Sequence, residues 1–188
     1  MTPDRASPYT HRNVWALAAP MILSNVTVPL LGLVDTAVMG HLDHPRYLAA
    51  IAVGATIFSF LFIGLNFLRM GTTGLAAQAR GANDADGMRA VLAQAILIAL
   101  AMAGAVILLQ VPIGHFAFWL IAPAPEVLEP AWTYYRVRVW AAPAALANFA
   151  LVGWFIGMQN TRAPLFIMLT TNLTNIALSV LLVIGLGY

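Results

Sequence analysis

Five long apolar segments, separated by short polar joints, make up most of the 188-residue chain. They run approximately from Val14 to Met39, Leu48 to Leu68, Val91 to Trp119, Trp132 to Met158 and Leu165 to Gly187. Because an α-helix rises about 1.5 Å per residue, each segment is long enough to cross a hydrocarbon core of roughly 30 Å. The pattern predicts an all-α, polytopic membrane bundle over residues 14–188, preceded by a polar tail at residues 1–13.

The composition agrees with this fold class and narrows the function. The chain is 61% hydrophobic and only 9% charged, whereas a soluble domain carries about 25% charged residues. Cysteine is absent, which excludes disulfides and thiolate metal sites. The nine basic residues are scattered and form no basic patch, so the lipid bilayer is the expected partner and nucleic acid is not.

Arginine residues are distributed unevenly between the two sides of the segments. The side of the N-terminal tail carries Arg5, Arg12, Arg80, Arg89 and Arg162, and only Arg46 falls in an opposite loop. Basic residues collect on the cytoplasmic side of a membrane protein. We therefore expect a cytoplasmic N-terminus and outward-facing loops around residues 41–45 and 123–130.

The first segment contains one carboxylate, Asp35. A charge at that depth costs on the order of 3 kcal/mol, so the side chain should face protein or water. Residues placed at 100° intervals on a helix put a polar set on one face of roughly 120°, namely Ser24, Asn25, Val28, Gly32, Asp35 and Thr36. Asp35 either reaches water near the end of its helix or titrates inside a cavity, and the shared polar face favours the cavity.

The fifth segment carries a second polar face of roughly 100°, formed by Thr171, Asn172, Asn175 and Ser179. Such residues often form hydrogen bonds between membrane helices, which are worth about 0.6 kcal/mol per pair. The alternative is that they line the same cavity as Asp35. The sequence leaves both interpretations open.

Polar residues near the second segment allow further predictions. Arg69 either snorkels to the cytoplasmic headgroups or forms an ion pair inside the bundle. The stretch Gly71-Thr72-Thr73-Gly74 has too few glycines, and no following Lys, for a phosphate-binding loop. We expect a flexible or tightly packed junction there. The loop residues His41, Asp43 and His44 lack a fourth metal ligand, and we expect them to be solvated.

The fourth segment contains two arginines and a proline. Arg136 and Arg138 are two residues apart, so on a helix they point to different sides, one toward anionic headgroups and the other toward the bundle. Pro143 removes a backbone hydrogen bond near the middle of this segment and is expected to kink the helix.

Several sequence stretches together resemble the multidrug and toxic compound extrusion family, and within it the branch of the DNA-damage-inducible protein F. They are Ala19-Pro20-Met21, Leu33-Val34-Asp35-Thr36-Ala37-Val38-Met39-Gly40-His41-Leu42, Phe67-Leu68-Arg69-Met70-Gly71-Thr72-Thr73-Gly74, Ala77-Gln78-Ala79, Gly157-Met158-Gln159-Asn160-Thr161-Arg162-Ala163-Pro164 and Asn172-Leu173-Thr174-Asn175. The matching stretches cover nearly the whole chain in the right order. The resemblance implies a bacterial cytoplasmic (inner) membrane protein of two six-helix lobes around a central cleft.

The resemblance also implies a function and a site. Members of that family export drugs, organic cations and other amphipathic compounds in exchange for protons or sodium. Asp35 would be the coupling carboxylate of the first lobe and Asn175 its partner on the fifth helix, with a cavity lined by Asn25, Gly32, Thr36, Thr171, Asn172 and Ser179. Many relatives carry an aspartate at the position of Ser179, which cannot titrate. With one carboxylate available, we expect the coupling ion to be H+ rather than Na+, and no other cofactor.

The length indicates that this chain is a portion of a longer transporter. Five segments provide an incomplete N-terminal lobe, so the C-terminal lobe of the same protein is an expected partner. A flippase for lipid-linked precursors and a non-transporting membrane scaffold are the alternatives. An intramembrane enzyme is not expected, because the segments offer one acid, no Cys and, apart from His115, no histidine.

Overall fold

The computed structural model describes residues 15, 18, 19, 22, 45–179 and 181. These residues are helical with short turns, and no β-strand occurs among them. The chain divides into two compact units, one within residues 39–158 and the other formed by residues 1–38 and 159–188. The predicted all-α class is confirmed.

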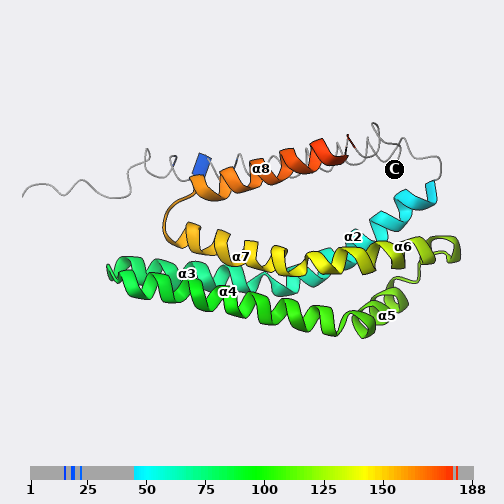
Figure 1. Ribbon diagram of the computed structural model, residues 1–188, viewed down its shortest axis with the longest axis horizontal. Coiled ribbons are helices and arrows are strands. Elements are labelled where there is room, and N and C mark those ends of the chain that lie inside the picture. The colour runs from blue at the N-terminus through cyan, green and yellow to red at the C-terminus, as the bar shows by residue number, and fades with distance from the viewer. Residues whose placement is uncertain (1–14, 16–17, 20–21, 23–44, 180, 182–188) are drawn as a thin grey trace, which may run out of the picture. The chain divides into compact units, whose positions relative to one another are not determined.

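The larger unit contains three helical stretches (Figure 1). They consist of α2 (Pro45–Leu65) with α3 (Phe67–Gly81), α4 (Ala85–Leu108) with α5 (Gln110–Ile121), and α6 (Pro125–Arg138) with the 3-10 turn η1 (Val139–Ala141) and α7 (Ala142–Gly157). Within the described ranges, helices over Arg46–Gly81, Ala85–Leu108 and Pro125–Gly157 are long and apolar enough to cross a membrane. The other unit contains α8 (Arg162–Ser179).

Small residues form much of the contact between the helices of the larger unit. Helix α3 packs against α4 and α7, α4 packs against α7, and α2 packs against α6. The fully buried alanines are Ala76, Ala99, Ala103, Ala131, Ala142 and Ala150. In lipid no hydrophobic force drives helices together, so close approach of backbones through small residues provides the dispersion contact that holds them.

An aromatic cluster fills the unit where α2, α5 and α6 meet. The rings of Phe58 and Tyr135 stack with centroids 5.5 Å apart, and those of Phe118 and Trp132 stack at 4.6 Å. The buried Tyr135 hydroxyl donates a hydrogen bond of 2.8 Å to the carbonyl of Gln110. Figure 1 shows the start of α2, helix α5 and the start of α6 toward one end of this unit, opposite the turn between α3 and α4.

The second helical stretch extends beyond the predicted segment. The sequence predicted an end at Leu68 and a junction at residues 71–74, but α3 continues without a break to Gly81. The predicted flexible junction is wrong, and the predicted tight packing holds for the two threonines but not for Gly71 and Gly74, which are exposed. Thr72 is buried, and its hydroxyl donates to the Leu68 carbonyl one turn earlier at 2.7 Å, which keeps the polar group satisfied inside a helix.

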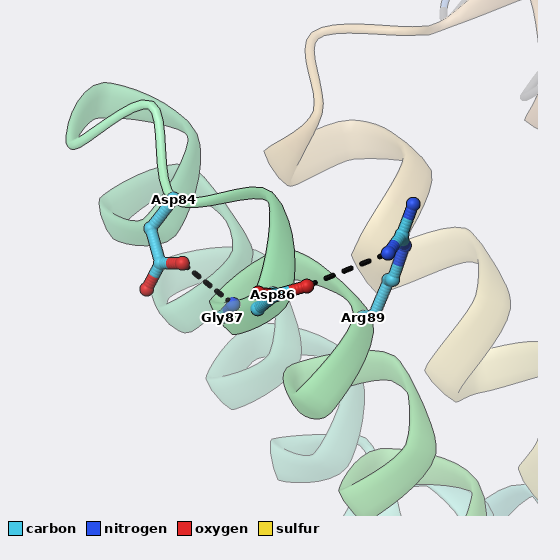
Figure 2. A network of polar contacts seen from close by, with 4 residues as sticks. All are labelled: Asp84, Asp86, Gly87 and Arg89. Atoms are coloured by element: carbon cyan, nitrogen blue, oxygen red, sulfur yellow. Dashed lines mark hydrogen bonds and ion pairs between the residues drawn. The ribbon is translucent and has the colours of Figure 1, made fainter.

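The third predicted segment is two helices, α4 and α5, and the first of them begins earlier than predicted. Helix α4 begins at Ala85 rather than at Val91, because Asp84 caps it. The Asp84 carboxylate accepts a 2.9 Å hydrogen bond from the Gly87 N–H (Figure 2). A cap of this kind is worth about 1 kcal/mol. The ion pair between Asp86 and Arg89 (3.4 Å) joins two exposed side chains and adds little.

Proline accounts for the breaks in the third and fourth segments. Pro112 has no N–H to donate to the Leu108 carbonyl, and α4 ends at Leu108. Pro143 lies in the first turn of α7, directly after the 3-10 turn at Val139–Ala141. The interruption predicted at Pro143 is confirmed by this turn, and the missing backbone donor of Pro143 is tolerated in the first turn of α7. Pro130, by contrast, lies inside α6 without ending it.

Candidate functional site

Only part of the predicted site lies within the residues that the structure describes. Asp35, Asn25, Gly32 and Thr36 lie outside the described residues, as do the loop residues His41, Asp43 and His44. The fifth-segment residues Thr171, Asn172, Asn175 and Ser179 all lie on α8. The structure therefore describes only the fifth-segment residues of the predicted site, and their role stays a prediction.

Helix α8 has the regular geometry that the predicted polar face requires. The Asn160 side-chain oxygen accepts a 3.3 Å hydrogen bond from the Ala163 N–H at its first turn. Thr171 and Asn175 are exposed and Asn172 is half-buried. A spacing of three or four residues puts these three on one face of the helix. The predicted stripe is thus present, and its contact with Asp35 stays a prediction.

A group of hydrogen bonds fastens α3, α4 and α7 together near the turn between α3 and α4. The Thr73 hydroxyl lies 3.1 Å from the Gly153 carbonyl of α7. The Trp154 indole N–H donates to the Met88 carbonyl of α4 at 2.9 Å. The Arg80 guanidinium donates to the Met158 carbonyl just beyond α7. These contacts connect three helices through polar groups and make this end of the unit a single packed body.

Two glycines of α7 allow α3 to approach this closely. A Cβ atom on Gly153 would lie 2.5 Å from the carbonyl oxygen of Arg69, and one on Gly157 would lie 2.6 Å from that of Thr73. Both distances are too short for a real side chain. The two glycines are four residues apart, the spacing that brings small residues onto one helix face. That spacing was the available sequence signal for this contact, and the sequence reasoning missed it.

Arg69 lies within the continuous helix formed by α2 and α3 and is exposed. Its backbone, rather than its charge, makes the contact with Gly153. In the described part of the chain, the one ion pair joins Arg89 and Asp86. The predicted ion pair of Arg69 inside the bundle is thus absent from that part, and snorkelling stays a prediction.

Asn148 is a polar residue of α7 that sequence reasoning missed. It is half-buried between Pro143 and Gly153, in a stretch with no other amide. Its side chain makes no hydrogen bond with any residue that the structure describes. An isolated amide inside a membrane span is costly without a partner, and that cost was the sequence signal that would have identified it.

No group of three or more His, Cys, Asp or Glu residues that could hold a metal ion occurs within residues 45–179 or the few others described. The cavity of amides, hydroxyls and one acid expected from the sequence stays a prediction.

Long apolar helices that pack through small residues and carry scattered amides define an integral membrane helical bundle. The chain belongs to the MatE family, whose family model matches residues 20–181. This confirms the resemblance drawn from the sequence.

Three relatives show how this similarity is distributed. The chain is 51% identical over 173 residues to the DNA damage-inducible protein F of Escherichia coli, covering 92% of this chain and 38% of that protein. It is 30% identical over 181 residues to the multidrug resistance protein PmpM of Pseudomonas aeruginosa, covering 93% and 36%. It is 25% identical over 177 residues to the probable multidrug resistance protein NorM of Acinetobacter baylyi, covering 94% and 39%.

The chain spans less than two fifths of the length of these three relatives. No solved structure gives a match.

Proposed function

We propose that this chain is the N-terminal portion of a cation-coupled antiporter that exports organic cations, drugs or other xenobiotics across the bacterial cytoplasmic membrane. The observation that carries the proposal is the 51% identity to the DNA damage-inducible protein F over 92% of this chain, within a family match that spans residues 20–181. The 30% identity to a protein named for multidrug resistance supports export as the activity.

Asp35 is the residue proposed to couple the ion to the substrate. It is the one acid within the five apolar segments. A carboxylate removed from water favours its neutral form, because the charged form loses its hydration. A proton and a cationic substrate then compete for the same acid, and neither can shift the transporter except by the difference in its affinity for the two states.

The polar face of α8 is proposed to form the other wall of this cavity. Thr171, Asn172 and Asn175 offer hydroxyl and amide oxygens but no group that titrates near neutral pH. They can orient a substrate and stabilise a neutral or charged Asp35. The site then has one group that exchanges a proton and several that hold position, which favours H+ over Na+ as the coupling ion.

The contacts among α3, α4 and α7 suggest that these three helices move as one rigid body during transport. These helices share the hydrogen bonds of Thr73, Arg80 and Trp154 at their proposed cytoplasmic end. Because the helices are tied through buried glycines, we expect them to move together between the inward-open and outward-open states. Bending is expected instead at the 3-10 turn before Pro143.

Transport by the reconstituted full-length protein tests this proposal. Liposomes containing it are loaded with a pH gradient or with a sodium gradient, and the movement of ethidium, a fluorescent organic cation, is followed. We expect the pH gradient alone to drive ethidium exchange. Movement driven only by sodium would overturn the choice of proton. Absence of movement under both gradients, with flipping of a lipid-linked precursor instead, would overturn export itself.

A further inference from the structure

Two arginines in the last turn of α6 sit on aromatic side chains. The guanidinium carbon of Arg136 lies 5.5 Å from the centre of the Trp132 ring. That of Arg138 lies 5.4 Å from the rings of both Tyr134 and Phe58, and Arg138 also donates a hydrogen bond to the Tyr134 hydroxyl. The aromatic faces hold both guanidinium planes in place.

Neither arginine has an anionic partner in the part of the chain that the structure describes. The one ion pair there joins Arg89 and Asp86 of α4. The acids nearest along α6, Glu126 and Glu129, are seven or more residues from either arginine, which is about two helical turns or more. Both arginines are exposed, and a guanidinium carries five N–H donors, so each keeps donors that are free to bind an anion.

The surroundings of these donors are apolar. Val137 is 72% exposed and Trp140 is 65% exposed. No charged residue follows between Arg138 and Arg162, so the two arginines mark one edge of the apolar stretch that contains α7. Exposed tryptophan and tyrosine next to arginine at such an edge are typical of the headgroup region of a bilayer. The anion available to an outward-facing guanidinium at that level is a lipid phosphate.

We propose that α6 binds the phosphate groups of anionic phospholipids through Arg136 and Arg138. The planar guanidinium offers paired N–H donors that match phosphate oxygens, which an ammonium group does not. The two arginines are two residues apart and point to different sides of α6, so each takes a separate lipid. Arg138 holds one on the side of Phe58 in α2, and Arg136 holds one on the side of Trp132, whose ring contacts His115 and Phe118 of α5.

The binding of phosphatidylglycerol to the full-length protein tests this site. The purified protein is titrated with phosphatidylglycerol in phosphatidylcholine nanodiscs, and native mass spectrometry counts the anionic lipids it retains. Because each arginine takes a separate lipid, we expect Arg136→Gln or Arg138→Gln alone to weaken the binding of one of the two lipids about fivefold, and the double variant to weaken the binding of both. Arg→Lys at the same positions keeps the charge but not the paired geometry, and we expect it to recover only part of the affinity.

Arg46→Gln is the matched control. Arg46 is an exposed arginine in the first turn of α2, and its guanidinium lies 4.9 Å from the Tyr47 ring, but it is not on α6. We expect its removal to leave the two retained lipids in place. Three outcomes would overturn the site: retention unchanged in the double variant, an equal loss in Arg46→Gln, or no preference for phosphatidylglycerol over phosphatidylcholine. The first would indicate that a carboxylate of the longer protein neutralises the arginines instead.

Discussion

Asp35→Asn in the full-length protein is expected to reduce coupled export to the level of cells that lack the transporter. Asparagine keeps the size of the side chain and its hydrogen bonding but cannot bind and release a proton. No other acid lies within the five apolar segments, so no group of these segments can take over the exchange. Loss of ethidium from energised cells that express each variant measures the effect.

Asp86→Asn makes the same chemical change at a place where no effect on export is expected. Asp86 is exposed in the first turn of α4, and its side chain forms only a surface ion pair with Arg89. Export by this variant should match that of the unmodified protein at equal amounts in the membrane. Undiminished drug export by Asp35→Asn would contradict the coupling role and would favour a stability role for this acid.

Gly153→Leu is expected to prevent the larger unit from packing correctly. A Cβ at this position would lie 2.5 Å from the Arg69 carbonyl oxygen, and backbone atoms cannot rotate away as a flexible side chain can. Overpacking a close contact costs roughly 1–3 kcal/mol and more where backbone must shift. We expect little folded protein, or a midpoint of thermal unfolding lowered by several degrees, measured by circular dichroism of the full-length protein in detergent.

Gly104→Leu provides the matched control on a neighbouring helix. A Cβ on Gly104 would have no atom within 4 Å, so the larger side chain has room. Leucine is also a better helix former than glycine by up to about 1 kcal/mol. The control should therefore unfold at an equal or slightly higher temperature. An equal loss in both variants would mean that the α3 and α7 contact does not depend on the absence of a side chain at Gly153.

The local fold could be predicted from the sequence wherever one residue dictates it. The apolar segments predicted helices, and Pro143 predicted a break because proline lacks an N–H. The same reasoning applied to Pro112 would have divided the third segment. The cap at Asp84 was also readable, as an acid just before a helix, but the polar residues there suggested a loop up to Val91.

Contacts between helices were harder to predict because they depend on partners that are distant in the sequence. Nothing local to Thr73 or Arg80 indicates that each reaches a carbonyl of α7 or just beyond it. The residues Gly71-Thr72-Thr73-Gly74 looked like a junction because glycine is a weak helix former. The stretch is nevertheless helical, and Thr73 within it contacts both Gly153 and Gly157 of α7.

The same contrast between local pattern and distant contact applies to the predicted site residues. The polar face of α8 followed from spacing alone; the helix is confirmed, and the role of that face as part of a site stays a prediction. Whether that face meets Asp35 depends on tertiary arrangement, which neither spacing nor the described residues determine. Asn148 was missed because a lone amide forms no periodic pattern, although its half-buried place on α7 makes it a further polar group of the bundle.

The most direct test of competition between a proton and a cation at Asp35 is a binding measurement. The affinity of the purified full-length protein for ethidium is measured as the pH is lowered from weakly alkaline to weakly acidic, for the unmodified protein and for Asp35→Asn. Protonation removes the negative charge that attracts the cation, so we expect the affinity of the unmodified protein to fall as the pH falls. The affinity of the variant should be lower at high pH and nearly constant. The same pH dependence in both proteins would contradict the coupling role assigned to Asp35.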